Sequence, residues 1–199
     1  MDPGGWSTKP TESGPTLTSL PAGEVAISVT QVEYSNTPDG PLIHIFGREP
    51  GGAARHLQVT GFRPYFYAPV DQVRARPPAS NAVPDWESVH TSIKGDRVVR
   101  IYTQRPTDVR EAREQYQHFE ADIPFATRFM IDCGLTGGVI APGVNADYRE
   151  IRPAVIYAPA RVCMLDIECE DQRGFPEPTR DAIICITCWD SYIDRYVNF

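Results

Sequence analysis

The chain has 199 residues, of which 41% are apolar, and a formal net charge of −7 at pH 7. This length supports one large domain, or one domain and part of another. No apolar run is long enough to span a membrane, and the N-terminus lacks a signal-peptide pattern, so we expect a cytoplasmic protein with no membrane partner. The negative charge excludes nucleic-acid binding by bulk electrostatics, but not binding through local arginines or a pocket.

Five cysteines and no secretion signal favour reduced thiols. Cys185 and Cys188 form a C-x-x-C pattern inside an apolar run that is typical of a strand. Residues three apart on a strand face opposite sides, so the pair cannot readily share a metal. We therefore interpret both cysteines as small buried apolar residues rather than as a redox or metal pair.

The N-terminal half has the pattern of a tail followed by short strands and turns. Residues 1–23 are rich in Pro, Gly, Ser and Thr, which predicts a disordered tail. Strands are expected over 24–33, 41–47, 56–60 and 63–68, with a Pro-Asp-Gly turn near residues 36–40 and a second turn near 49–52. Residues 72–84 have the composition of a surface excursion, and 98–102 predicts another strand.

Two helices are predicted next. The first begins near Pro106, with Thr107 as N-cap. The second follows Asp122 as N-cap, carries Phe125, Phe129 and Cys133 on one stripe, and ends at Gly134. Glycines and prolines then indicate a connection, followed by a β segment near 155–157.

Arginines occur in two groups along this stretch. Arg97, Arg100 and Arg105 are one group, and Arg110 and Arg113 are the other. We interpret them as a solvated strand edge and a solvated helix face, in preference to a DNA-binding track.

The last part of the chain predicts three antiparallel strands over 162–168, 182–190 and 192–199. The first carries Asp166 and Glu168, two acids one residue apart at the end of an apolar run. Their side chains share one face of the strand, and two like charges on a buried strand are costly unless a cation binds. Such hard oxygen ligands suit Mg²⁺ or Mn²⁺ and are typical of metal-assisted phosphoryl chemistry.

These elements predict an α+β fold with a mixed domain over residues 24–158. A second, incomplete domain is expected over 159–199, because three strands with an acid pair match only the opening of a ribonuclease H-like fold. A sheet truncated in this way would leave an unpaired edge and an uncovered apolar face.

Three segments resemble the archaeal branch of the family B DNA polymerases, in that family's order and at about its spacing. They are Phe62-Arg63-Pro64-Tyr65-Phe66-Tyr67-Ala68-Pro69, the segment 120–135 with Asp-Ile-Pro-Phe-x-x-Arg, and Leu165-Asp166-Ile167-Glu168 with the strand that follows. The resemblance covers most of the chain from about Val25 onward. It implies the N-terminal part of a replicative polymerase, with the start of a 3′–5′ proofreading exonuclease domain.

In that family the Asp-x-Glu strand is the first exonuclease motif. The resemblance implies that Asp166 and Glu168 bind two divalent metals at the 3′-terminal phosphodiester. The later exonuclease motifs, and the palm, fingers and thumb, do not occur in this sequence. We therefore expect that this chain alone neither polymerises nor proofreads and does not stably hold Mg²⁺ or Mn²⁺. A sliding clamp would dock only through a C-terminal part that is absent here.

The resemblance also implies that the first domain binds template single-stranded DNA and senses deoxyuracil. A close-packed pocket excludes the thymine methyl by shape, and fixed polar groups distinguish uracil from cytosine. By motif matching the pocket residues are Tyr34, Pro64, Val98, Pro124, Phe125 and Arg128. Gly95 stands near Val98 where some relatives have a more rigid residue, which bears on how tight the pocket is.

Structural roles compete with these assignments. Pro124 is also a good helix-start proline, and Phe125 with Phe129 suits a core. Arg128 is spaced to pair with Asp132 on one helix face. Two alternatives to the polymerase interpretation remain. One is a split nuclease or polymerase subunit completed by a partner chain that supplies the remaining domains, and the other is a non-catalytic paralogue that acts as an interaction module.

Overall fold

The computed structural model describes residues 20–171 and 174–199, so most of the expected N-terminal tail lies outside the described residues. The chain forms two compact units, one ending at Ala158 and one beginning at Pro159. Within the described residues, unit 1 contains two sheets and three helices, and unit 2 contains a single sheet. The expected α+β class is confirmed. No helix of the described residues is long and apolar enough to cross a bilayer.

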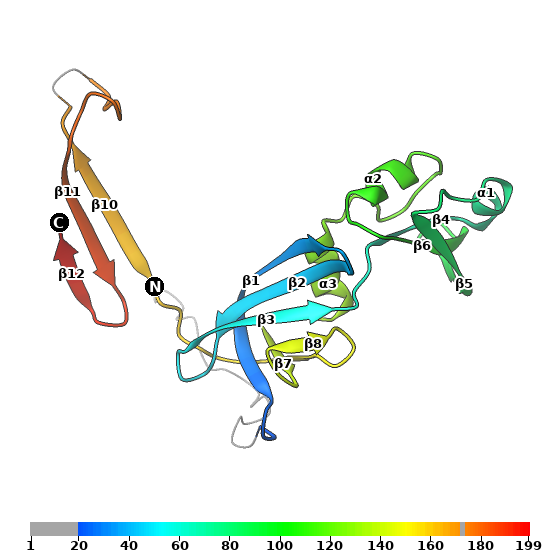
Figure 1. Cartoon of the computed structure of the whole chain (residues 1–199), viewed down its shortest axis with the longest axis horizontal. Coiled ribbons are helices and arrows are strands. Elements are labelled where there is room, and N and C mark those ends of the chain that lie inside the picture. Colours follow the sequence, from blue (N-terminus) through cyan, green and yellow to red (C-terminus); the bar gives the residue numbers. More distant parts are fainter. Residues whose placement is uncertain (1–19, 172–173) are drawn as a thin grey trace, which may run out of the picture. The chain divides into compact units, whose positions relative to one another are not determined.

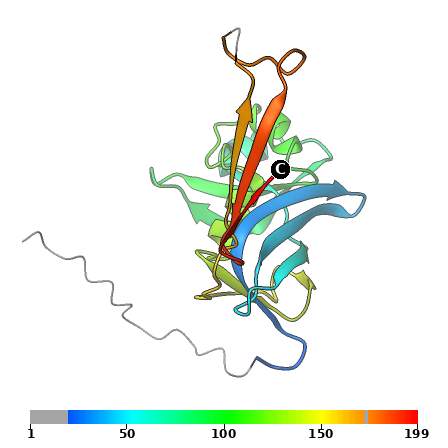
Figure 2. The same ribbon diagram turned by 90° about the vertical axis from the view of Figure 1, so that its left-hand side faces the viewer.

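The larger sheet of unit 1 is built on a long, curved hairpin, drawn in blue in Figures 1 and 2. In spatial order its strands are β8 (Asn145–Asp147), β3 (Ala54–Thr60), β2 (Gly40–Arg48), β1 (Val25–Thr37), β7 (Gly138–Ala141) and β9 (Arg152–Ala154). All neighbours are antiparallel except β3 and β8. The predicted hairpin turn is confirmed: Thr37 pairs with Gly40, which takes a φ of +122° that glycine adopts without strain.

The second sheet has the order β4-β6-β5 and is antiparallel throughout. Its strands are β4 (Tyr65–Pro69), β6 (Arg97–Thr103) and β5 (Ala82–Thr91). The strand expected over 98–102 is confirmed, but the surface excursion expected over 72–84 is only partly right, because residues 74–77 and 79–80 are exposed whereas Val73 and Ala82 are buried. That segment contains the end of helix α1 (Val70–Ala75) and the start of β5, because Val70, Val73 and Ala82 are buried against this sheet.

Helices α2 (Asp108–Arg113) and α3 (Phe125–Asp132) follow as predicted, with differences at their starts. Thr107 precedes α2 but makes no capping hydrogen bond; instead the Asp108 carboxylate accepts one from the Arg105 backbone N–H at 2.9 Å. The N-cap of α3 is Pro124 and not Asp122. A proline just before the first turn fits because its missing N–H would have no helical partner.

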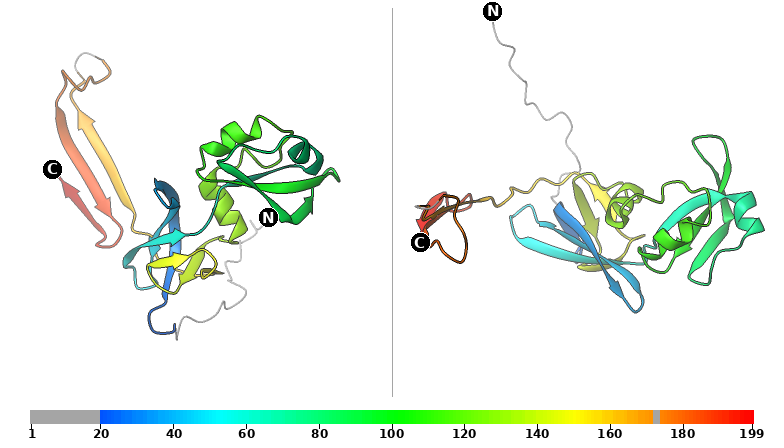
Figure 3. Two further views of the ribbon diagram at one scale, coloured as in Figure 1. Left: turned by 45° about the vertical axis from the view of Figure 1, so that its right-hand side comes forward. Right: turned by 90° about the horizontal axis from the view of Figure 1, so that it is seen from above.

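The core of unit 1 lies between α3 and the larger sheet, an arrangement that Figure 3 shows. Phe125 and Phe129 project from α3 into a cluster of fully buried sheet residues: Ile27, Ile43, Ile45, Leu57, Val59 and Val139. The predicted apolar stripe of α3 is therefore confirmed. Gly134 ends the helix as expected, with a φ of +64°.

Some residues of unit 1 were misassigned from the sequence. The connection expected after Gly134 holds the short strands β7 and β8, and the segment expected near 155–157 is displaced to β9. Leu20, inside the range expected to be disordered, packs against the buried cluster of Ala26, Ile140 and Ile156.

Unit 2 is a three-stranded antiparallel sheet, β10 (Cys163–Cys169), β11 (Ile183–Asp190) and β12 (Arg195–Asn198). The three predicted strands are confirmed. The expectation that the first strand is buried is wrong: every residue from Cys163 to Glu168 is exposed. The reason is that the described residues of unit 2 include no helix or second sheet to cover either face.

Candidate nucleic-acid interface

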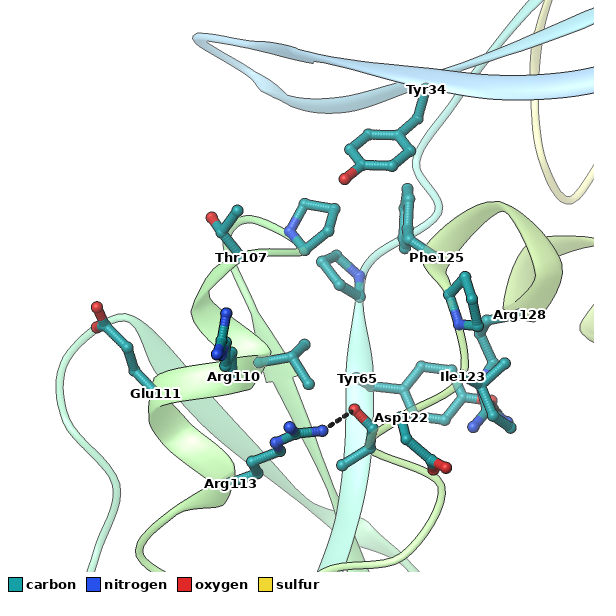
Figure 4. Close-up of a pocket in the computed structure, with 15 residues that line it drawn as sticks. Tyr34, Tyr65, Thr107, Arg110, Glu111, Arg113, Asp122, Ile123, Phe125 and Arg128 are labelled. Carbon is teal, nitrogen blue, oxygen red and sulfur yellow. Dashed lines mark hydrogen bonds between the residues drawn. The ribbon is translucent and has the colours of Figure 1, made fainter.

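Unit 1 contains a cavity of about 590 Å³ between α2, the start of α3 and the tip of β1 (Figure 4). We call it the Phe125 cavity. It brings together five of the six predicted pocket residues: Tyr34, Pro64, Pro124, Phe125 and Arg128. The five come from three separate parts of the chain, and the packing of α3 against the larger sheet assembles them.

An aromatic pair forms one wall. Tyr34 lies 39% exposed on β1 and meets Phe125 edge to face, with ring centroids 5.1 Å apart and planes at 82°. Phe125 is buried and also contacts Phe62, at 5.5 Å between centroids. The structural alternative for Phe125 is thus confirmed, because the ring belongs to the core, and the same ring also lines the cavity.

Arg128 is 5% exposed, which is unusual for a charged side chain. Its guanidinium donates to the Glu120 carboxylate at 2.6 Å and to the Glu120 carbonyl at 3.0 Å. The predicted pairing with Asp132 is also present, at a longer 4.0 Å. Burial lowers the pKa of Arg128, but the hydrogen bond to Glu120 and the nearby charges outweigh it and raise that pKa.

Tyr65 connects Arg128 to β4. Its ring lies 4.7 Å from the Arg128 guanidinium carbon, and its hydroxyl donates to the Asp132 carboxylate at 2.6 Å. Burial, followed by the bond and charge of Asp132, raises the pKa of Tyr65 well above its ordinary value. Tyr65 therefore stays neutral at physiological pH, and Arg128 is held rigidly at the cavity wall.

Val98 is the one predicted residue that the structure does not bring to the Phe125 cavity. It is buried within β6, pairs with Pro69 and His90 on the neighbouring strands, and lines a different hollow. The aliphatic side chains that do line the cavity are Val109 of α2 and Ile123. Sequence reasoning missed both, although Ile123 lies inside the Asp-Ile-Pro-Phe motif itself.

Two arginines of α2 also line the cavity, so the prediction that they form only a solvated helix face is incomplete. Arg113 donates to the Ala121 carbonyl at 3.0 Å and ties α2 to the segment before α3 (Figure 4). Arg110 is exposed at the rim. Glu111 and Asp122 are exposed acids that also line the cavity, so charges of both signs surround it.

In unit 2, Asp166 and Glu168 lie opposite Thr187 and Cys185 of β11, and strand alternation puts both acids on one face. As oxygen donors they match the preference of Mg²⁺ or Mn²⁺. However, the described residues contain no group of three or more His, Cys, Asp or Glu that could hold a metal. Two exposed carboxylates alone do not make a complete metal site, and we derive no chemical step from them.

Comparison with known proteins gives a consistent result. Residues 116–196 match the DNA polymerase family B exonuclease domain. DNA polymerase 2 of Aeropyrum pernix is 27% identical over 202 residues, covering 81% of this chain and 25% of that protein. DNA polymerase 1 of Pyrococcus abyssi is 34% identical over 127 residues, covering 54% of this chain and 16% of that protein.

The fold agrees with these matches. The solved structure of the family B DNA polymerase from Pyrobaculum calidifontis superposes with a TM-score of 0.70 and 24% identity, over 88% of this chain and 26% of that one. The chain thus spans about a quarter or less of the length of these relatives. The sequence matches to the exonuclease domain and to the archaeal polymerases show that this chain is similar to part of a family B DNA polymerase.

Proposed function

We propose that unit 1 binds template single-stranded DNA and holds a deoxyuracil base in the Phe125 cavity. The observation that carries the proposal is the convergence of Tyr34, Pro64, Pro124, Phe125 and Arg128 in one cavity. The other domains of a polymerase would be the partners of this unit, as expected for a family whose members are several times longer.

Shape would exclude thymine, which differs from uracil by one methyl group. Prolines have no free side-chain rotation, and Phe125 is fixed by Tyr34 and Phe62. Moving these side chains away from a larger base would therefore cost packing energy. Where the base lies directly against this wall, forcing one extra methyl into the contact would cost about 1–3 kcal/mol, which corresponds to a preference for uracil of roughly 5- to 150-fold.

The backbone of β4 supplies polar groups that could distinguish uracil from cytosine. Tyr67 exchanges two backbone hydrogen bonds with Phe119 across the outer edge of β4, at 3.1 and 2.9 Å. Residues two apart on a strand turn their N–H and C=O groups the same way, so those of Tyr65 also face this outer edge. A fixed donor and acceptor beside the cavity would match the polar edge of uracil and mismatch that of cytosine.

Binding of two strands that differ in one base tests the proposal. The full chain is titrated against fluorescent single strands carrying one deoxyuracil or one thymine. We expect tighter binding of the uracil strand, and loss of that preference in Phe125→Leu and Tyr34→Ala. Phe175→Ala is the matched control because Phe175 is 94% exposed in unit 2. Equal affinities of the unmodified chain for both strands at several salt concentrations would refute uracil recognition.

For unit 2 we propose that Asp166 and Glu168 are the first two metal ligands of a 3′–5′ exonuclease site that needs further ligands from elsewhere. The match to the exonuclease domain supports this assignment. The full chain incubated with single-stranded DNA and Mn²⁺ should release nucleotides no faster than Asp166→Asn does. Release that depends on Asp166 would show that these two acids suffice.

A further inference from the structure

A second cavity, of about 720 Å³, adjoins the Phe125 cavity, and the two share Tyr65 and Arg128 as lining residues. We call it the Arg100 cavity. Four arginines and four tyrosines contribute to its lining: Arg63, Arg100, Arg128, Arg149, Tyr65, Tyr67, Tyr102 and Tyr148. The net charge of the chain is −7, so a cluster of four arginines around one cavity is a local exception that favours binding of an anion.

Arg100 is held in place by neutral partners. Its Nη1 donates to the Tyr102 hydroxyl at 2.9 Å, while its Nε and Nη2 donate to the Tyr67 hydroxyl at 3.3 and 3.0 Å. Arginine has five N–H donors, so two remain for a ligand. Each of these hydroxyls accepts from Arg100 and keeps its own proton, which is free to be donated. The group therefore presents hydrogen-bond donors in a fixed arrangement.

Arg63 adds an exposed positive charge to the cavity lining. Its guanidinium carbon lies 4.7 Å above the Tyr102 ring, and its side chain is exposed. Among the described residues, neither Arg63 nor Arg100 forms a salt bridge with a carboxylate. Both charges are therefore available to an anion that enters the cavity.

The carboxylates that line the cavity are already engaged. Glu120 pairs with Arg128 at 2.6 Å, and Asp132 accepts from the Tyr65 hydroxyl. Arg149 is likewise occupied, by Asp147 at 2.7 Å. Arg63 and Arg100 are thus the two arginines of this cavity lining that have no carboxylate partner among the described residues.

We propose that the Arg100 cavity binds a backbone phosphate of the same single strand whose base occupies the Phe125 cavity, through Arg63, Arg100 and the hydroxyls of Tyr67 and Tyr102. A phosphodiester offers several acceptor oxygens and a negative charge, which match a site made of donors. The shared wall of Tyr65 and Arg128 makes the two cavities adjacent, so one strand can reach both. This inference rests on the proposed DNA binding, but not on uracil recognition.

The test uses the full chain and a uracil-free oligothymidylate, with affinity measured by fluorescence anisotropy across a salt series. Arg63→Gln and Tyr102→Phe probe the cavity, and Arg55→Gln is the charge-matched control, because Arg55 lies on the larger sheet beside Glu49. Losing one phosphate contact should reduce the slope of log K against log salt by about 0.7 in Arg63→Gln. Affinity should fall about 3- to 10-fold in both cavity variants.

Three further measurements test whether the Arg100 cavity binds a backbone phosphate. Arg63→Gln and Tyr102→Phe should leave the uracil-to-thymine affinity ratio unchanged, which separates this inference from the uracil proposal. Inorganic phosphate and thymidine monophosphate serve as competitors; if either displaces the strand at micromolar concentration, the cavity is a small-anion site and the inference is wrong. An Arg63→Gln variant that binds with the affinity and salt slope of Arg55→Gln also overturns it, and circular dichroism checks that the exposed Arg63→Gln variant is folded.

Discussion

Arg128→Met tests whether Arg128 is a structural residue as well as a cavity wall. Methionine keeps the apolar stem but removes the charge and all five donors. The change deletes the two hydrogen bonds to Glu120, the contact with Asp132 and the stacking on Tyr65. We expect unit 1 to lose stability while keeping its fold.

The magnitude follows from the exposure of each partner. The Glu120 side chain is 49% exposed, so that ion pair is screened by solvent and contributes at most about 1 kcal/mol. The bond to the Glu120 carbonyl contributes about 1–1.5 kcal/mol and the stacking on Tyr65 about 1 kcal/mol. The expected loss is therefore about 2–4 kcal/mol, or roughly 5–15 °C in Tm.

Urea unfolding of both proteins, followed by circular dichroism, measures this loss. Arg152→Met is the control because Arg152 pairs with Glu24 at the exposed surface, and it should cost less than about 1 kcal/mol. A loss in Arg128→Met no larger than in Arg152→Met would refute the structural role. Arg128 would then contribute to DNA contact alone.

Two further predictions concern a strand contact and a titration. Gly47→Ala should destabilise unit 1 by more than about 2 kcal/mol in urea unfolding, because the added Cβ would lie 2.2 Å from the Ser28 carbonyl oxygen. Gly51→Ala is the control: its added Cβ would have no atom within 4 Å, so its free energy of unfolding should be nearly unchanged. The hydrogen bonds from Arg149 lower the pKa of Asp147 from 3.8 to about 2. The stabilisation from ionised Asp147 is therefore present above pH 3.8 and lost as the pH falls toward 2. A carboxyl NMR titration should show this pKa returning toward 3.8 in Arg149→Gln, and an unchanged value in that variant would contradict the assignment.

Local patterns in the sequence predicted much of the fold. The Pro-Asp-Gly turn, the stripe of Phe125 and Phe129 and the stop at Gly134 depend on backbone sterics and side-chain spacing within a few residues. These features appear in the structure where they were expected. The start of α3 was displaced to Pro124, since Asp122 is equally suitable as a cap and only packing selects between them.

The cavity depended on tertiary structure. Motif matching identified Tyr34 and Phe125 separately, but their contact exists because α3 packs on the larger sheet near the tip of β1. The same packing admits Val109 and leaves Val98 buried inside β6, a distinction that two valines on apolar stretches do not reveal in sequence. The sequence by itself determined the hairpin turn, helix α3 and the three strands of unit 2, because those preferences are local, whereas α1, β7 and β8 were not evident from it. Which side chains meet was decided by the tertiary structure, because that depends on how sheets and helices stack across distant parts of the chain.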